Sequence, residues 1–208
     1  MITPTKPWDN IFKEQGYYFD EPHEAIPGVV RRLHQQQART VLDLGSGSGR
    51  HVVYLAEQGF EVYGLDNSPE GLRLTEDWLT RQQLAADLRL GDMTEPLPYA
   101  DNEFDALISV HVIHHADIAT IKRLIGEIER VLKPGGLLFI SVPKNRNQAE
   151  NFEEIEPNTL VPLDGMEQGL PHHFFTPAEL HEVFANFSDR EIQLDTKEHY
   201  CLTGYLRG

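Results

Sequence analysis

Three aspartates stand at or just after the ends of short apolar segments: Asp43, Asp66 and Asp92. Asp43 precedes the glycine-rich turn Gly45-Ser46-Gly47-Ser48-Gly49. Glycines in such a turn let the backbone bend sharply and approach a ligand closely. In dinucleotide sites the turn presents backbone N–H groups to a pyrophosphate. An acid directly before the turn would repel that anion, so the sequence argues against a pyrophosphate ligand here.

The other two acids indicate which nucleoside ligand fits. S-adenosylmethionine carries a sulfonium, an ammonium and a carboxylate but no phosphate, so it tolerates Asp43. Asp66 can accept hydrogen bonds from both ribose hydroxyls, which suits this ligand or NAD but disfavours the 2′-phosphate of NADP. Gly91-Asp92-Met93 adds an acceptor for the adenine amino group and an apolar side chain for the base. An NAD site needs no such element.

Alternating helices and strands are expected to position these acids. Apolar strands are expected at 40–44, 61–65, 87–90, 104–110 and 137–142, and helices at 24–37, 50–58, 68–84 and 118–132. Continuous apolar strands are typical of parallel sheets buried on both faces. The alternation predicts a doubly wound, Rossmann-like α/β domain. A last helix at 177–184 and strands at 191–196 and 200–206 predict a C-terminal hairpin at one sheet edge.

The ordered motifs resemble class I S-adenosylmethionine-dependent methyltransferases of the UbiE-like, methyltransferase type 11/25 sort. The matching stretches are 43–49, 64–68, 91–93, 97–99 with 102–105, 131–136 and 173–180. The resemblance implies a seven-stranded, mostly parallel sheet with one antiparallel strand, reached by the terminal hairpin. It also implies methyl transfer from S-adenosylmethionine, which leaves S-adenosylhomocysteine.

The resemblance also assigns parts of the cofactor to particular residues. It places the methionine end at the Asp43 turn, the ribose at Asp66, and the adenine at Asp92 and Met93. The methyl group is expected beside the segment Ser109-Val110-His111. Arg50 is expected to pair with the cofactor carboxylate or, alternatively, to form a surface ion pair. The full expected cofactor-binding set is Tyr17, Asp43, Gly45, Ser46, Gly47, Arg50, Asp66, Asn67, Asp92, Met93 and Ser109.

Two histidine pairs are the candidates for acid–base chemistry. We expect at least one of His114, His115, His172 and His173 to contact the acceptor or take its proton. The histidines could instead ligate a metal with Glu154 or Glu156. Adjacent histidines often point to opposite sides, however, and no helical i, i+4 pair is present. We therefore expect no metal site.

The chain of 208 residues is expected to form a single methyltransferase domain, 1–208. Within it, aromatic-rich residues 1–38 are expected to form a lid or helical segment, with Tyr17 over the cofactor. The polar stretch 143–170 lacks clear periodicity and is expected to be the insertion that sets acceptor specificity.

The net charge and the composition indicate which partners and which cellular location to expect. The net charge is −15 and basic residues are scattered, which disfavours nucleic acid. We therefore expect a small-molecule acceptor. The alternatives are a protein or tRNA acceptor, a non-catalytic S-adenosylmethionine-binding module, and an NAD-dependent oxidoreductase. One cysteine, no signal-peptide pattern and no membrane-length apolar run predict a cytoplasmic protein without membrane association. The sequence does not fix the oligomeric state.

Overall fold

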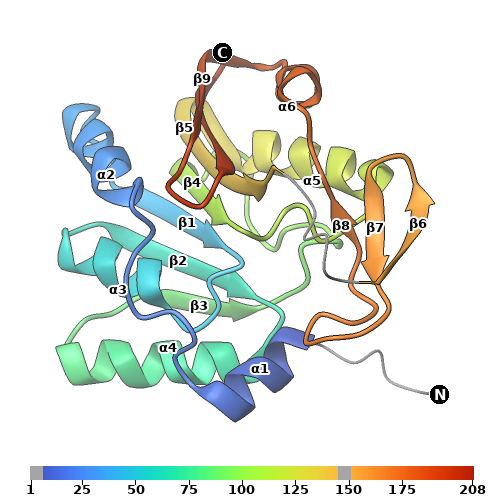
Figure 1. Ribbon diagram of the computed structural model, residues 1–208. Helices are drawn as coiled ribbons and strands as arrows, with labels where there is room; N and C mark the ends of the chain where they lie inside the picture. Colours follow the sequence, from blue (N-terminus) through green and yellow to red (C-terminus); the bar gives the residue numbers. More distant parts are fainter. Residues whose placement is uncertain (1–6, 145–150) are drawn as a thin grey trace.

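The structure, a computed structural model, describes residues 7–144 and 151–208. Its centre is a seven-stranded sheet with the strand order β3-β2-β1-β4-β5-β10-β9 (Figure 1). The first five strands run parallel, and β10 is antiparallel to both β5 and β9. The strands are β1 (Thr40–Leu44), β2 (Glu61–Asp66), β3 (Asp87–Leu90), β4 (Phe104–Val110), β5 (Leu132–Pro143), β9 (Phe187–Leu194) and β10 (His199–Leu206). The expected Rossmann-like sheet and its terminal hairpin are confirmed.

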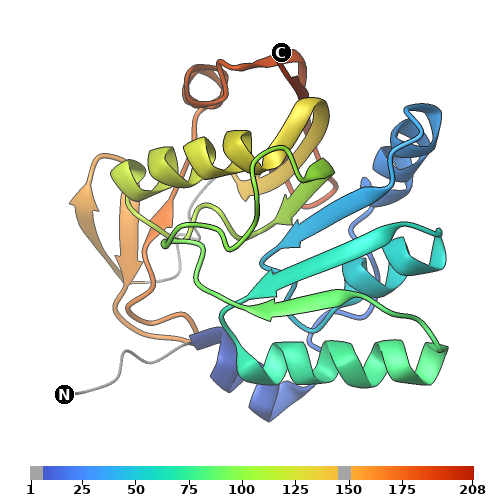
Figure 2. The same cartoon turned by 180° about the vertical axis from the view of Figure 1, so that it is seen from behind.

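Helices cover both faces of this sheet. They are α1 (Pro7–Gln15), α2 (Ile26–Gln35), α3 (Arg50–Glu57), α4 (Pro69–Gln82), α5 (Ile118–Val131) and α6 (Pro177–Val183). Successive residues of a strand point to opposite faces. Accordingly, Val41 packs in a core with α2, α3 and α4, whereas Leu42 packs in a second core with α5 and α6. Figure 2 shows α5 running across the second face. Among the described residues, no helix is both long and apolar enough to cross a membrane.

The N-terminal segment is tied to the start of α4. Ser68 caps α4 by accepting a hydrogen bond from the Gly71 N–H at 2.9 Å. The Asp9 carboxylate, on α1, accepts from the Ser68 hydroxyl at 2.7 Å and from the Glu70 N–H at 3.0 Å. These bonds place α1 against the helix that follows β2, close to the ends of the central strands. Residues 1–6 of the expected N-terminal segment lie outside the described residues.

Residues 151–173 form a second, three-stranded antiparallel sheet rather than an irregular insertion. Its strands are β6 (Phe152–Glu156), β7 (Thr159–Pro162) and β8 (His172–His173). Asn158, at φ 63°, makes the tight turn between β6 and β7, a backbone conformation that asparagine tolerates. This sheet lies on the side to which the carboxyl ends of β1–β3 point (Figure 1). Residues 145–150 of the expected insertion lie outside the described residues.

Candidate active site

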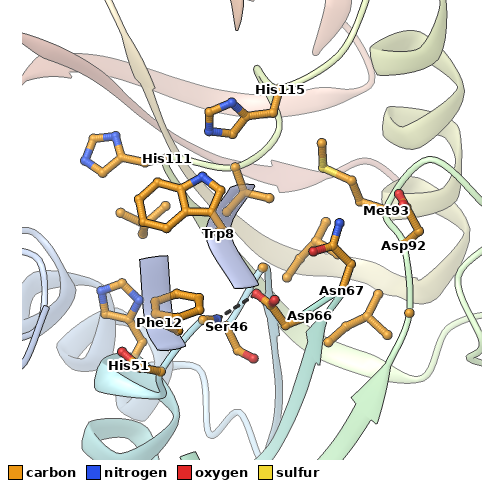
Figure 3. Close-up of a pocket in the computed structure, with 18 of the residues that line it drawn as sticks. Trp8, Phe12, Ser46, His51, Asp66, Asn67, Asp92, Met93, His111 and His115 are labelled. Carbon is orange, nitrogen blue, oxygen red and sulfur yellow. Dashed lines mark hydrogen bonds between the residues drawn. The ribbon is translucent and has the colours of Figure 1, made fainter. Parts of the chain in front are cut away.

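A cavity of about 240 Å³ opens at the carboxyl ends of β1, β2 and β4 (Figure 3). This is the point where the strand order reverses, because β2 and β3 lie on one side of β1 and β4 lies on the other. Ligands of open α/β sheets bind at such switch points. Trp8 and Phe12 reach the cavity from α1, and Leu170 reaches it from the loop before β8.

The glycine loop after β1 forms the floor of this cavity. Gly45 and Gly47 have φ angles of 78° and 54°, a left-handed conformation that side chains disfavour. A Cβ atom on Gly45 would also lie 2.3 Å from a Val112 methyl group. The Asp66 carboxylate accepts hydrogen bonds from the Gly47 N–H at 2.7 Å and from the Ser68 N–H at 2.8 Å. Asp66 therefore holds the loop as well as lining the cavity.

Asp43 lies fully buried behind this loop. Neither of its carboxylate oxygens has a hydrogen-bond partner among the described residues, and His51 Nδ1 is 3.8 Å from Oδ2. Burial raises the pKa of Asp43 to about 7, with Arg50 opposing the rise and Asp66 adding to it. A buried carboxylate without donors is unfavourable. Asp43 does not line the cavity, but the positive charge of a ligand held there would favour its ionised form, so the site fits S-adenosylmethionine.

The expected ribose and adenine residues also face the cavity. Asp66, Asn67, Asp92 and Met93 are all in its wall, and so is Ser46 (Figure 3). One Asp92 oxygen accepts from the Thr94 N–H and hydroxyl, at 2.9 and 2.8 Å. The structure therefore brings together acids from the ends of separate strands, as the sequence predicts.

Three expected cofactor residues, Tyr17, Asp43 and Ser109, do not line this cavity. The Tyr17 hydroxyl donates to the Leu74 carbonyl at 2.9 Å, and its ring packs edge-on against Trp78. Tyr17 thus fixes the N-terminal segment to α4, whereas Trp8 and Phe12 of the same segment line the cavity. Ser109 is buried in β4, where its hydroxyl donates to the Leu44 carbonyl of β1 at 2.9 Å.

A larger cavity of about 600 Å³ adjoins the first. The two cavities share Trp8, Phe19, Arg50, His111 and His115. The larger one is bounded by residues 18–24, by 162–167 of the second sheet and by the 195–199 turn of the C-terminal hairpin. Segments far apart in the sequence thus enclose one space beside the switch point.

Three of the four predicted histidines lie together, and two of them, His114 and His115, line this larger cavity. His114 and His115 follow β4, and His172 comes from β8. The ring centroid of His115 lies 3.9 Å from that of His114 and 4.7 Å from that of His172. Burial lowers the pKa of His115 to about 4 and that of His114 well below its usual value, and the neighbouring imidazoles add to both shifts. Both rings are therefore neutral at pH 7.

The fourth predicted histidine, His173, instead makes hydrogen bonds that hold the fold together. Its Nδ1 is 2.7 Å from the Thr159 hydroxyl and its Nε2 is 3.2 Å from the Glu179 carboxylate. It lines neither cavity. Glu156, a candidate metal ligand in the sequence, accepts hydrogen bonds from the Thr159 hydroxyl and from the N–H of Ile118, the first residue of α5.

A second histidine group was not predicted from the sequence, although one of its members, His111, was expected beside the methyl group. The Asp195 carboxylate lies 3.0 Å from His23 Nε2 and 2.8 Å from His199 Nδ1. The ring of His111 lies 4.2 Å from that of His199, and burial, with these neighbours, lowers its pKa to about 3. His23 and Asp195 are 172 positions apart. A histidine directly after the fourth expected strand was the one available signal.

Comparison with known proteins agrees with this geometry. A family model described as a methyltransferase domain matches residues 42–140. The chain is 37% identical to an uncharacterized methyltransferase of Mycobacterium tuberculosis (strain ATCC 25618 / H37Rv), over 85% of this chain and 71% of the relative. It is 36% identical to an uncharacterized methyltransferase of Synechocystis, over 54% of this chain and 55% of that relative.

Solved structures share the fold. A protein from Pyrococcus horikoshii OT3 superposes with a TM-score of 0.73 at 19% identity, over 95% of this chain and 99% of the other. The 1,6-didemethyltoxoflavin-N1-methyltransferase of Burkholderia thailandensis, solved with S-adenosylhomocysteine, has a TM-score of 0.66 at 23% identity, over 96% and 85%. Together with the ordered motifs, these matches show that the chain belongs to the class I S-adenosylmethionine-dependent methyltransferases.

Proposed function

We propose that this methyltransferase methylates a small molecule bound in the larger cavity. The observation that carries the proposal is the shared wall, since His111, His115 and Trp8 border both cavities. A donor in the narrow cavity and an acceptor in the larger one would meet at this wall. Holding two reactants side by side in this way is the main source of rate in a direct displacement.

The residues around the narrow cavity are proposed to hold the donor. When bound, S-adenosylmethionine supplies an electrophilic methyl group on a sulfonium. Asp43 would offset the positive charge, Asp66 and Asn67 would hold the ribose, and Asp92 with Met93 would hold the adenine. Trp8 and Phe12 on α1 are proposed to exclude water from the reacting groups. The segments 1–38 and 143–170 would thus act as lid and acceptor-specificity elements.

We assign removal of the acceptor proton to His199. The Asp195 oxygen, 2.8 Å from His199 Nδ1, keeps the proton of the neutral ring on that nitrogen. The other ring nitrogen is then left as an acceptor in a residue that lines the larger cavity. Asp195 is a positioning residue here. Its own hydrogen bonds lower its pKa to about 2, so it stays ionised.

Charge and relatives favour a small molecule over a protein or tRNA. A net charge of −15 is unfavourable for a polyanion. A more distant relative, 25% identical over 72% of this chain, is the ajmaline N-methyltransferase of Rauvolfia serpentina. The single cysteine suits a reducing cytoplasm, and we propose that location.

The acceptor class can be tested with methyl-labelled S-adenosylmethionine. The purified protein is incubated with a cell extract separated into small-molecule, protein and RNA fractions. We expect label in the small-molecule fraction, above an enzyme-free blank. Label found only in the protein or RNA fraction would overturn the small-molecule proposal.

A further inference from the structure

The imidazoles of His114, His115 and His172 form a buried group whose hydrogen-bonding capacity is not used up. Nδ1 of His114 and Nδ1 of His115 are buried and make no hydrogen bond to any residue that the structure describes. One ring nitrogen from each of the three histidines lies within 4.8 Å of the other two. Buried polar atoms normally have partners, so a cluster of unpartnered nitrogens calls for an explanation.

We propose that His114, His115 and His172 bind one divalent transition-metal ion. Neutral imidazole is a preferred ligand of zinc, copper, nickel and iron. Nitrogen ligands about 2.0–2.1 Å from a tetrahedral ion lie about 3.4 Å apart, so the three ring nitrogens need to close by up to about 1.4 Å. Three protein ligands leave a fourth position open, the arrangement typical of catalytic rather than structural zinc sites.

Glu167 supplies the charge that such an ion needs nearby. Its carboxylate oxygens lie 3.3 Å from His172 Nε2 and 3.8 Å from His115 Nε2. A carboxylate beside ligating histidines orients their rings and raises their affinity for metal. The remaining hydrogen bonds hold the cluster in place, since the His173 N–H donates to the His114 carbonyl at 2.8 Å. That bond joins β8 to the loop after β4.

The second group, His23, His111 and Asp195, is a weaker candidate for metal. It also has ligand atoms within 4.8 Å of one another. There, however, both His23 and His199 already hydrogen-bond to the Asp195 carboxylate. A metal would have to replace satisfied bonds in that group, whereas Nδ1 of His114 and Nδ1 of His115 have no hydrogen-bond partner within residues 7–144 and 151–208.

No metal site was expected from the sequence, because each pair of adjacent histidines was considered separately. The loop after β4 turns both rings of the first pair to one side, and β8 adds His172 from the second sheet. His114, His115 and Glu167 all line the larger cavity. The ion's open position would therefore bind a hydroxyl, thiol or amine of the acceptor and favour loss of its proton to His199 or water. This role rests on the proposed function, whereas binding of the ion does not.

The experiment measures ion binding without any acceptor. Untagged, metal-free protein is titrated with Co²⁺ and Zn²⁺, followed by equilibrium dialysis and the visible Co²⁺ spectrum. We expect about one ion per chain with a low-symmetry, nitrogen-rich spectrum. His115→Gln and His172→Gln should lose the spectrum, and Glu167→Gln should weaken binding about tenfold. The exposed His181→Gln and the second-group variant His23→Gln should bind normally.

Folding is checked by circular dichroism and by S-adenosylmethionine affinity for each variant. X-ray absorption at the metal edge of the wild type, which needs no variant, should show three imidazole ligands. The proposal is overturned if the wild type binds no ion, if absorption shows no imidazole, or if His23→Gln rather than His172→Gln abolishes binding. Ion binding without methyl transfer to any small molecule would instead count against the proposed function alone.

Discussion

The Asp66 carboxylate accepts a hydrogen bond from the Gly47 N–H at 2.7 Å, joining the end of β2 to the glycine loop after β1. One side chain therefore shapes the loop and also faces the cavity. Asp66→Ala should weaken S-adenosylmethionine binding by about 1.5–3 kcal/mol, since hydrogen bonds to a charged group are lost. Calorimetry measures the change. Asp77→Ala, an exposed acid on α4, is the control, and unchanged affinity in Asp66→Ala would sink the ribose assignment.

Cofactor affinity should depend on pH through Asp43. Its folded pKa is about 7 because the carboxyl is buried. A cationic ligand favours the ionised form of Asp43. The affinity for S-adenosylmethionine should therefore rise between pH 6 and pH 8, and binding should release a proton. Calorimetry in two buffers of different ionisation enthalpy detects the proton. Asp43→Asn should abolish the pH dependence, and a wild-type affinity that is flat over this range contradicts the assignment.

Replacing His199 should slow the reaction without loosening the cofactor. Loss of a general base costs about 100-fold or more in turnover. His199→Gln should therefore lower kcat while S-adenosylmethionine affinity stays the same. Asp195→Asn should also lower kcat, because the ring loses the carboxylate that holds the proton on Nδ1. The exposed His181→Gln is the control, and normal turnover in His199→Gln would exclude it as the base.

The four histidines predicted from the sequence should separate into two classes. His115→Gln and His114→Gln should cut turnover, because both side chains line the larger cavity. His173→Gln should instead lower the free energy of unfolding by about 1–3 kcal/mol, since Thr159 and Glu179 lose a buried partner. Steady-state kinetics and urea unfolding measure the two effects. Normal turnover in all four single variants, His172→Gln included, would refute the original acid–base prediction.

Acid should destabilise the protein more than its carboxylates alone would suggest. Burial lowers the folded pKa of His111 to about 3 and of His115 to about 4, and lowers those of His51 and His114 further. In the unfolded chain these histidines take up a proton near pH 6.5, whereas in the folded protein they stay neutral to lower pH. The folded state is therefore most stable above pH 6.5 and loses this stability as the pH falls below 6.5. Each histidine that stays neutral contributes about 1.4 kcal/mol between pH 7.5 and 5.5.

Asp43 acts in the opposite direction over the same range. Its raised folded pKa of about 7 means that stability falls as the pH rises from about 4 to 7. This offsets about 2 kcal/mol of the histidine effect, leaving a net loss of about 3.5 kcal/mol between pH 7.5 and pH 5.5. Urea unfolding with a chelator present measures the difference. Equal or greater stability at pH 5.5 would show that these histidines are not buried and neutral.

The sheet and the meeting of Asp66 and Asp92 at one cavity were predictable because their signals are local. Apolar runs such as Phe104–Val110 mark buried parallel strands, and each acid follows its own strand directly. The Ser68 cap and Pro69 likewise mark the start of α4 within three residues. Once such strands lie side by side, their carboxyl ends must meet at one edge.

The acceptor side was not predictable because its contacts are distant in sequence. The polar strand β6 carries no alternating apolar pattern, so only pairing with β7 reveals it. Tyr17 and Trp8 are both aromatics of one irregular segment, and the packing of α1 on α4 decides which faces the cavity. The Asp195 group requires β10 to bring His199 beside His111 and His23, which no spacing rule describes.

The central claim is that donor and acceptor occupy two adjoining cavities that share His111 and His115. A crystal structure with S-adenosylhomocysteine and an acceptor found in the fractionation assay tests it most directly. The account predicts the product between Asp66 and Met93 in the narrow cavity, and the acceptor beside His199 in the larger one. Product density elsewhere, or an acceptor outside the larger cavity, would contradict it.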